Sequence, residues 1–429
     1  MPDHFPHLHT RPATGWVNDP NGIGFWDGQW HVMMQWNPNG TGWGDIHWAH
    51  LSSPDLLHWT EERPGLTPRP GTIDAGGAWS GVAATDDDGR IALIYSATPA
   101  GPDEVGVAIA RLAPGTQDVW EQPDAMTLPH PDGPGFKDVR DPFLFHHEGR
   151  RLALQGSRID DHGAVLLFDV EDLDDWKYLG TLLSDHEVGD PIPREPNFWE
   201  CPQLVRVGDR WVLVVSWCSL GEATVDSGAR AVAAWAGDLV ADGDGYRFVP
   251  ETSAALDHGE DFYAPQLVEA EGRALAWGWS WDGHHEIAAD RPEADVVASG
   301  WAGTMTFPRE VALDDAGVPV LRPAPELAAL KAGALPVTHE GAGRVLTTDE
   351  AAWAATVDAG WSLVLEGPDG VRDVLGPDRP AGEVWVDGSI VEVFDAAGST
   401  TVRAYPADGE TWVLISDGAI AAHRLALPA

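Results

Sequence analysis

Short runs of apolar residues, separated by clusters of Gly, Pro, Asp and Asn, recur along the first 310 or so residues of the chain. No long segment has the periodicity of an amphipathic helix. Regular short strands with turn signals between them predict an all-β fold of the sandwich, barrel or propeller kind. The expected strands are Trp30 to Gln35, Ile91 to Ser96, Val105 to Arg111, Arg151 to Gln155, Ala164 to Val170, Trp211 to Trp217, Ala231 to Ala236 and Ala274 to Trp279.

The spacing of these strands favours one of the three architectures. Groups of strands recur roughly every 50 to 60 residues, which is typical of a propeller with about five four-stranded blades. No self-similarity between the blades is evident in the sequence. The periodicity by itself therefore leaves the number of blades open.

The character of the chain changes after residue 310. The segment LRPAPELAALKAGALP begins rich in proline and then predicts a short helix from Pro325 to Lys331. Alternating strands follow it, and VWVDGSIVEVF predicts a hairpin with a tight turn at Asp387-Gly388. We therefore expect a propeller domain over residues 1–310, a linker with a short helix over 311–333 and a β-sandwich over 334–429.

The amino-acid composition excludes some classes of binding partner. The 26 Lys and Arg residues against 68 Asp and Glu give a formal net charge of −42, which argues against binding nucleic acid or an anionic membrane. With only Cys201 and Cys218, a disulfide framework is excluded. The first residues lack the features of a signal peptide, and no apolar stretch is long enough to span a membrane, so we expect a cytoplasmic protein.

Three carboxylates stand in motifs built from turn residues. Asp19 lies in GWVNDPNG, where Pro and Gly predict a polar turn, while Asp141 and Glu200 lie in RDP and ECP, each just before an apolar run that reads as a strand. A nucleophile, an acid/base and a group that orients the sugar are what glycoside cleavage requires. Taken alone, each motif has a plainer interpretation: a turn, an exposed Arg140–Asp141 pair or a structural glutamate.

Taken together, WVNDPNG, HVMMQWNP, WGDIHWAHLSSPDLLHW, RDP, the Glu-Cys pair, DFYAPQ and GWAGTMTFPRE resemble the β-fructosidases of glycoside hydrolase family 32. That family includes invertases, inulinases and levanases, and the resemblance runs almost end to end, with the motifs in the family's order. It implies five blades followed by a C-terminal β-sandwich. It also implies a retaining β-fructofuranosidase that releases terminal β-D-fructofuranosyl units from sucrose or fructo-oligosaccharides.

The resemblance assigns a role to each carboxylate. Asp19 is the expected nucleophile and Glu200 the general acid/base, with a pKa raised by burial or by a second carboxylate. Asp141 is the expected stabiliser of the oxocarbenium-like transition state, positioned by Arg140. Retention of configuration predicts that the two reacting carboxyl groups lie about 5–5.5 Å apart, and a gap near about 8 Å indicates inversion.

The substrate-binding residues follow from matching motifs. Trp281 is expected to line the pocket, although Trp279 is an alternative for that place, and residues 300–310 are expected to close the last blade. Trp79, where the family has Phe, makes that wall of the pocket bulkier. The expected binding set is Asn18, Gln35, Trp43, Trp79, Ser80, Arg140, Cys201, Tyr263 and Trp281.

We expect neither a metal nor another cofactor in catalysis. The residues Asp45, His47 and His50, and the pairs His146-His147 and His284-His285, lack the spacing of a zinc signature, and no phosphate-binding loop is present. Three alternatives to a hydrolase of sucrose or fructans stay open: a fructosyltransferase, a sucrose-6-phosphate hydrolase and a non-catalytic fructan-binding protein. The expected partner is a small fructoside or oligosaccharide, and the oligomeric state, with a homo-oligomer among the options, is left open.

Overall fold

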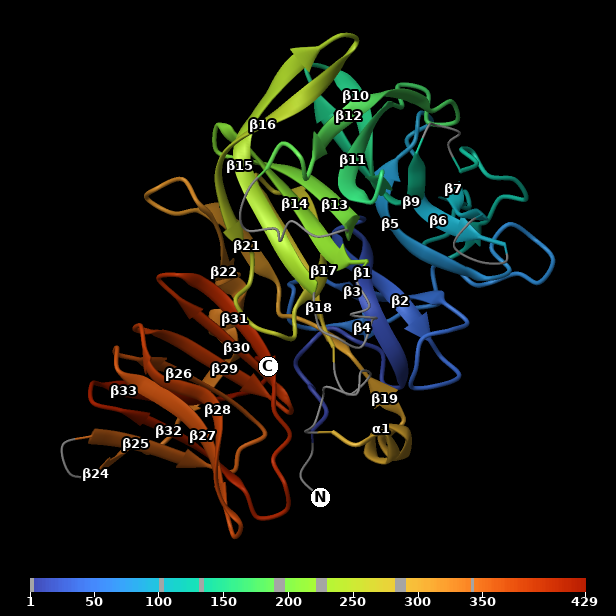
Figure 1. Ribbon diagram of the computed structural model, residues 1–429. Coiled ribbons are helices and arrows are strands. Elements are labelled where there is room, and N and C mark those ends of the chain that lie inside the picture. Colours follow the sequence, from blue (N-terminus) through green and yellow to red (C-terminus); the bar gives the residue numbers. More distant parts are fainter. Residues whose placement is uncertain are drawn as a thin grey trace.

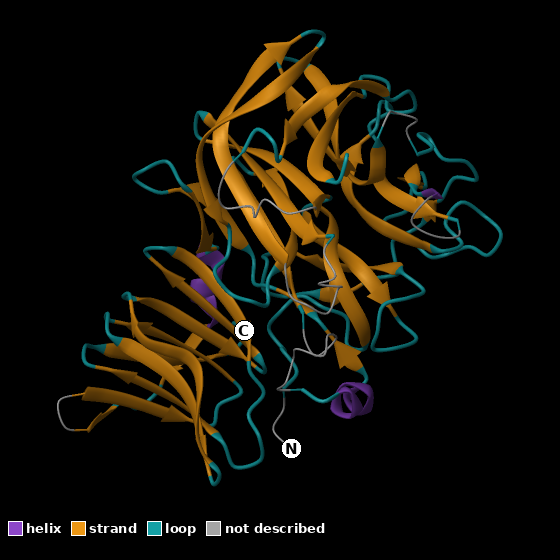
Figure 2. Cartoon of the chain, viewed as in Figure 1, coloured by secondary structure: helices purple, strands orange, loops and turns teal. Residues whose placement is uncertain are grey.

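The computed structural model describes residues 4–99, 104–130, 135–188, 197–220, 230–281, 291–340 and 343–429. Small sheets set around a common axis form a five-bladed β-propeller, and a β-sandwich of two larger sheets follows it (Figure 1). Strands dominate the chain, as Figure 2 shows, and the predicted fold class is confirmed. Within the described ranges, no helix is long and apolar enough to cross a membrane.

Each blade is an antiparallel sheet, and all eight strands predicted from the sequence are present. In the first four blades the strands run in chain order from the axis outwards. The strands are β1 Gly15–Trp26, β2 Gln29–Asn37, β3 His47–Ser53 and β4 Thr60–Glu61; β5 Gly77–Thr85, β6 Ile91–Thr98, β7 Gly106–Leu112 and β8 Trp120–Glu121; β9 Phe136–His147, β10 Arg150–Ile159, β11 His162–Asp169 and β12 Lys177–Ser184; β13 Asn197–Val207, β14 Arg210–Ser219, β15 Arg230–Asp242 and β16 Gly245–Ala255; and β17 Tyr263–Ala270, β18 Arg273–Ser280, β20 Thr304–Met305, β21 Arg309–Leu313 and β22 Pro319–Pro323.

The last blade is joined to the first by one short segment. After helix α1 (Glu293–Ser299), strand β19 (Trp301–Ala302) pairs in parallel with β1, and β20 immediately pairs with β18. The segment that we expected to close the last blade therefore bridges the fifth sheet and the first.

The innermost strands are bulged, which corrects one prediction. We expected a turn at Asp19-Pro20, but β1 continues through these residues with shifts of register on either side of Pro20. Asp141-Pro142 and Cys201-Pro202 likewise lie inside β9 and β13 rather than ahead of a strand. Since proline cannot donate to a ladder, it is accommodated at bulges, and a bulge re-aims the neighbouring side chain. The same residues that favour a turn thus produce a bend within a strand.

The second unit is a sandwich of a six-stranded and a five-stranded sheet. Its core is apolar, with Trp353, Trp361 and Leu414 fully buried between the sheets. The six-stranded sheet holds β23 Lys331–Ala334, β33 Ile420–Leu425, β26 Ala352–Val357, β29 Gly382–Asp387, β30 Ile390–Asp395 and β31 Gly398–Arg403, and the other holds β24 Thr338–Glu340, β25 Gly343–Thr348, β32 Thr411–Ser416, β27 Trp361–Gly367 and β28 Gly370–Arg379.

Two details of this region differ from the sequence-based expectation. Asp387 pairs with Ile390, so the two-residue turn of the hairpin is Gly388-Ser389, with Gly388 at φ 59°. The expected boundary after residue 310 falls inside β21, because the fifth sheet runs on to the end of β22. The short helix is a 3-10 helix, Pro325–Leu330, as predicted in position. The limits of the two domains themselves stay a prediction.

A buried network of charges joins the propeller to the sandwich. Arg309 donates to Asp257 at 2.8 Å and to Glu392 of β30 at 2.7 Å, and it also bonds the hydroxyls of Ser399 and Thr401. His9 extends the network from the N-terminal segment. Its two ring nitrogens lie 2.8 Å from Asp387 and 3.0 Å from Glu392. Burial lowers the pKa of His9, but hydrogen bonds to two carboxylates outweigh it and raise the pKa above the ordinary value.

The network predicts a large effect of removing its central cation. In Arg309→Met, Glu392 and Asp257 lose their main charged partner while buried, so we expect the free energy of unfolding to fall by roughly 3–5 kcal/mol. The matched control is Arg424→Met, which breaks an ion pair with Glu350 whose arginine is 56% exposed and is expected to change stability by less than about 1 kcal/mol. Urea titration of both variants measures the difference, and equal effects would contradict the prediction.

Candidate active site

The carboxylate of Asp19 is held by side chains from three strands. Its Oδ2 accepts hydrogen bonds from Ser80 Oγ at 2.5 Å and from Gln35 Nε2 at 3.2 Å, and Oδ1 accepts one from Asn18 at 3.1 Å. Ser80 also accepts from Gln35 at 2.6 Å, which fixes both donors relative to each other. The β1 bulge supplies Asp19, β2 supplies Gln35 and the β5 bulge supplies Ser80. Asp19 is partly exposed, although both oxygen atoms of its carboxylate accept hydrogen bonds.

Glu200 is held from two other blades. Arg140 Nη2 of β9 donates to Oε1 at 2.7 Å, and the hydroxyl of Tyr263 of β17 donates to Oε2 at 2.7 Å. The arginine is itself positioned by the face of Phe198, 4.9 Å from the ring centroid. The Glu200 side chain is 21% exposed, so this carboxylate also reaches solvent while both its oxygen atoms are oriented.

Asp141 is the most deeply buried of the three carboxylates, with 5% of its side chain exposed. Its Oδ2 accepts from the backbone N–H of Cys201 at 3.0 Å. Burial raises the pKa of Asp141 to about 7; the charges of Glu200 and Asp19 act in the same direction, and Arg140 opposes them. Asp141 therefore holds its proton more tightly than an ordinary aspartate does.

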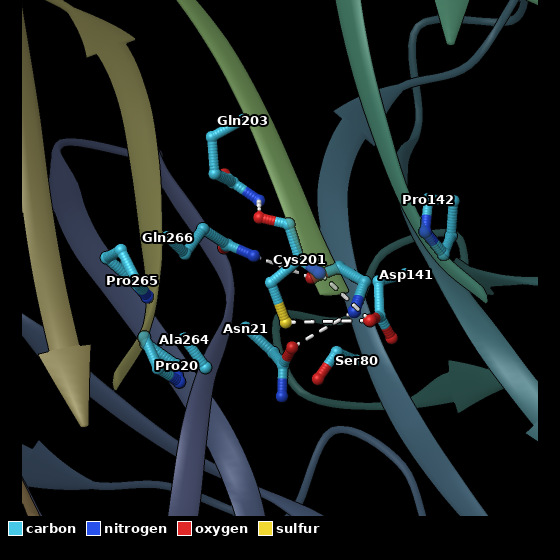
Figure 3. Close-up of a pocket in the computed structure, with 11 residues that line it drawn as sticks. Pro20, Asn21, Ser80, Asp141, Pro142, Cys201, Gln203, Ala264, Pro265 and Gln266 are labelled. Carbon is cyan, nitrogen blue, oxygen red and sulfur yellow. Dashed lines mark hydrogen bonds between the residues drawn. The ribbon is translucent and has the colours of Figure 1, made fainter. Parts of the chain in front are cut away.

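The thiol of Cys201 lies between two carboxylates. Its Sγ is 3.5 Å from Asp19 Oδ2 and 3.6 Å from Asp141 Oδ2. Burial, followed by the neighbouring negative charges, raises the pKa of this thiol well above the ordinary value, so it stays protonated and can donate. Figure 3 shows the sulfur atom directed towards Asp141, with Ser80 beside it.

Aromatic rings form the outer part of the site. Trp43, whose exposed fraction is 56%, packs edge-on against Trp79 with ring centroids 5.8 Å apart. Tyr263 stacks in parallel with Trp281 at 5.9 Å. Trp279 is buried and packs against Trp16, so the placement favours Trp281 as the pocket-facing residue. Exposed indole faces of this kind suit the apolar faces of sugar rings.

Ten of the twelve residues predicted for the site lie in one connected group of side chains, and the other two, Trp43 and Trp79, pack against each other. Asp19, with its donors, contacts Cys201, which contacts Asp141. Arg140 links Asp141 to Glu200, because its Nε lies 3.8 Å from Asp141 Oδ2 and its Nη2 donates to Glu200. Each blade contributes at least one member, so residues from all five sheets of the propeller meet in the site.

A set of polar residues beneath the carboxylates was missed at the sequence level. Asn21, Ser96, Gln203 and Gln266 bond backbone groups of neighbouring blades, for example Gln203 Oε1 to Leu267 N–H at 3.0 Å. Asn21, Gln203 and Gln266 also line a small pocket (Figure 3), whose full lining is Pro20, Asn21, Ser80, Gly81, Asp141, Pro142, Cys201, Gln203, Ala264, Pro265 and Gln266. The missed signal is a repeated proline followed by an amide: Pro20-Asn21, Pro202-Gln203 and Pro265-Gln266.

The histidines considered as metal ligands do not gather around a common point. His50 is buried and bonds His31 at 2.8 Å, whereas His47 bonds the carbonyl of Asp45. Burial lowers the pKa of both His31 and His50 to about 4. His146 is exposed, His147 packs against Trp211, and His284-His285 lies outside the described residues.

Comparison with known proteins identifies the family of the chain. Residues 9–323 match the family model described as the glycosyl hydrolases family 32 N-terminal domain. The chain belongs to glycosyl hydrolase family 32. The family inferred from the motifs is therefore confirmed.

Two curated relatives of this family-32 chain and one solved structure are informative. A sucrose-6-phosphate hydrolase of Zymomonas mobilis is 32% identical over 346 residues, which cover 76% of this chain but only 63% of that enzyme. A raffinose invertase of Escherichia coli is 31% identical over 450 residues, covering 94% of this chain and 90% of that protein. A family-32 β-fructofuranosidase of Bombyx mori shares the fold, with a TM-score of 0.78 at 23% identity over 99% of this chain and 95% of that one.

The raised pKa of Asp141 predicts that ionisation of this carboxyl lowers the stability of the fold. Because its folded pKa, about 7, exceeds the ordinary value of 3.8, its contribution to stability is present below pH 3.8 and is lost as the pH rises through 7. Asp141→Asn keeps the shape without the charge. We expect this variant to be more stable than the parent at pH 8, by up to about 4 kcal/mol, and equally stable near pH 4.

Thermal unfolding of parent and Asp141→Asn between pH 4 and 8 measures this effect. The control is Asp27→Asn, in an exposed turn at φ 51°, which is expected to leave the stability curve unchanged. An Asp141→Asn variant that is less stable than the parent at pH 8 would show that ionised Asp141 is a net stabiliser.

Proposed function

We propose that the chain is a retaining β-fructofuranosidase that removes terminal β-D-fructofuranosyl units. The observation that carries the proposal is that three carboxylates from β1, β9 and β13 share neighbours. Cys201 contacts the carboxylates of Asp19 and Asp141, and Arg140 lies beside those of Asp141 and Glu200. Two of the three carboxylates are partly exposed. Membership of family 32 and the names of the two curated relatives support the reaction class.

In this mechanism Asp19 attacks the anomeric carbon of the fructosyl unit. Its Oδ2 is anchored by Ser80 and Gln35, so the carboxylate presents itself with little freedom of rotation. Glu200 protonates the departing oxygen atom, and a covalent fructosyl-enzyme forms. Glu200 then takes a proton from the water that hydrolyses the intermediate. The separation of the two carboxyl groups expected for retention stays a prediction.

The remaining polar groups have supporting roles. Arg140 and Tyr263 fix the orientation of Glu200, and as donors they lie where charge changes at that residue. Asp141, in its ionised form, binds sugar hydroxyls and stabilises the positive charge that develops on the ring. The Cys201 thiol lies between Asp141 and Asp19, and its one proton can be donated to either carboxylate.

Sucrose and oligofructans are the substrates that we propose first, and sucrose 6-phosphate is the second candidate. The name of the Zymomonas mobilis relative favours the phosphorylated sugar. A phosphate requires charge-assisted hydrogen bonds, whereas Arg140, the buried cation of the described site, is already bonded to Glu200. Transfer of the fructosyl unit to a second sugar would proceed through the same covalent fructosyl-enzyme. The cytoplasmic location of the protein stays a prediction.

Release of reducing sugar, with identification of products, tests the proposal on sucrose, sucrose 6-phosphate, a short inulin oligosaccharide and levan. Free fructose from the unphosphorylated substrates supports it, and the ratio of rates names the preferred fructoside. Release of fructose and glucose 6-phosphate from sucrose 6-phosphate, with no release from the other substrates, identifies the second candidate. Longer oligosaccharides formed at high sucrose concentration identify transfer. A folded protein that binds fructans but releases nothing would contradict an enzymatic function.

Two substitutions separate the roles of the carboxylates. Asp19→Asn removes the nucleophile, so we expect kcat to fall by at least about 10³-fold on every substrate. Glu200→Gln removes the proton donor, so we expect a loss of about 10²–10⁴-fold on sucrose and a much smaller loss in formation of the intermediate from an aryl β-fructofuranoside. The aryl leaving group needs no proton.

Burst-phase kinetics with the aryl fructoside measures this difference, and Asp27→Asn again serves as the control with unchanged turnover. Full activity of Asp19→Asn would refute the assignment of the nucleophile. Equal losses for Glu200→Gln on both substrates would refute its role as acid.

A further inference from the structure

A second cluster of potential ligands lies on the third blade, outside the carboxylate site. It consists of His162 at the start of β11 and of Asp185 and His186 just after β12. One ligand atom from each residue lies within 4.8 Å of the other two. Among the residues that the structure describes, this is the one group of three or more His, Cys, Asp or Glu side chains with such geometry.

The carboxylate of Asp185 is oriented by its surroundings and has one oxygen atom to spare. Its side chain is only 8% exposed. Oδ2 accepts from the Asn197 side chain at 2.9 Å and lies 3.0 Å from His162 Nδ1. Oδ1 is buried and has no hydrogen-bond partner in the described chain, and it lies 3.9 Å from His186 Nδ1, too far for a hydrogen bond. A buried carboxylate oxygen without a donor is costly, and a cation removes that cost.

The two imidazole rings of the cluster lie in contact with each other. Their centroids are 3.9 Å apart with the planes tilted by 44°. Imidazole nitrogens are common ligands of transition metals. The side chain of His186 is 64% exposed and free to adjust, while Asp185 is fixed.

We propose that His162, Asp185 and His186 bind a divalent transition-metal ion of the zinc class. Two imidazole nitrogens and one carboxylate oxygen are a ligand set for Zn²⁺, with the fourth position left to water. Neighbouring ligand atoms in a tetrahedral zinc site lie roughly 3.3 Å apart, as follows from Zn–N distances near 2.0 Å, so closure of the cluster needs only a small movement of the exposed ring. The charge of −42 over the whole chain raises the local concentration of cations.

The position of the cluster gives such an ion a structural role. Asn197, which holds Asp185, is fully buried at the start of β13, and its Oδ1 accepts from the N–H of Gly163 at 3.1 Å. Its own N–H donates to the carbonyl of Asp161. An ion on Asp185 would therefore clamp the ends of β11 and β12 to the start of β13, three residues before Glu200. Second-shell contacts of this kind commonly orient metal ligands.

Metal titration of the full chain, without an affinity tag and after treatment with chelator, tests the proposal. We expect isothermal calorimetry and elemental analysis after dialysis to give one Zn²⁺ per chain. We also expect Zn²⁺ to raise the temperature of unfolding, because it binds the folded state. The double variant His162→Ala/His186→Ala is expected to weaken binding at least about tenfold and to abolish the thermal shift.

Two controls keep the test decisive. His339→Ala removes an exposed histidine on β24 of the sandwich and is expected to retain full binding. Asp185→Asn keeps the size of the side chain and is expected to weaken binding as the double variant does, with thermal unfolding in chelator checking that it is folded. Binding that is unchanged in the double variant, or no stoichiometric Zn²⁺ in the parent chain, would overturn the proposal.

Discussion

The packing of five inner strands around one axis is the constraint on which the rest of this structure depends. Strands that converge this closely cannot pair with each other along their whole length, so backbone amides at the bulges need other acceptors. Each junction between neighbouring blades supplies one from a side chain. Around the axis the acceptors are Asn21 for Gly81, Ser96 for Asp141, Asp141 for Cys201, Gln203 for Leu267 and Gln266 for Ile23.

One member of that ring belongs equally to the site above it. Asp141 seals the junction between the third and fourth blades through its carboxylate, and the same carboxylate carries a pKa raised by burial. The site is therefore not an addition to a finished scaffold. In the proposed mechanism the charge of Asp141 acts on the sugar, and the same carboxylate stands where the fold needs an acceptor. Arg140 offsets part of the cost of burying it by lying between Asp141 and Glu200.

Features that depend on local sequence pattern, such as the positions of the strands, are predicted well from the sequence. Short apolar runs predict the strands, and the resemblance of motifs selects residues of which ten form one connected group of side chains. What it could not supply was the consequence of proline inside a strand. Asp19-Pro20 was interpreted as a turn because proline and glycine favour turns, yet pairing with β2 continues past it. Whether such residues turn the chain or bulge it is decided by tertiary packing.

The amides at the axis were missed for a related reason. Gln203 and Gln266 are surrounded by apolar residues in the sequence, and nothing local indicates that the amides face a neighbouring strand. The repeat that would have revealed them is only two residues long. Its meaning follows from the fold, in which the amide after each proline accepts a hydrogen bond from the backbone of a neighbouring blade.

The charge network between propeller and sandwich has a consequence for how such chains are inherited. His9 and Arg309 come from one unit and Asp387 and Glu392 from the other, and all four are buried. A recombination that exchanged the sandwich for an unrelated module would leave two cations facing a surface without matching carboxylates. The two units are thus selected as a pair, and their sequences at this seam are expected to change together over evolution.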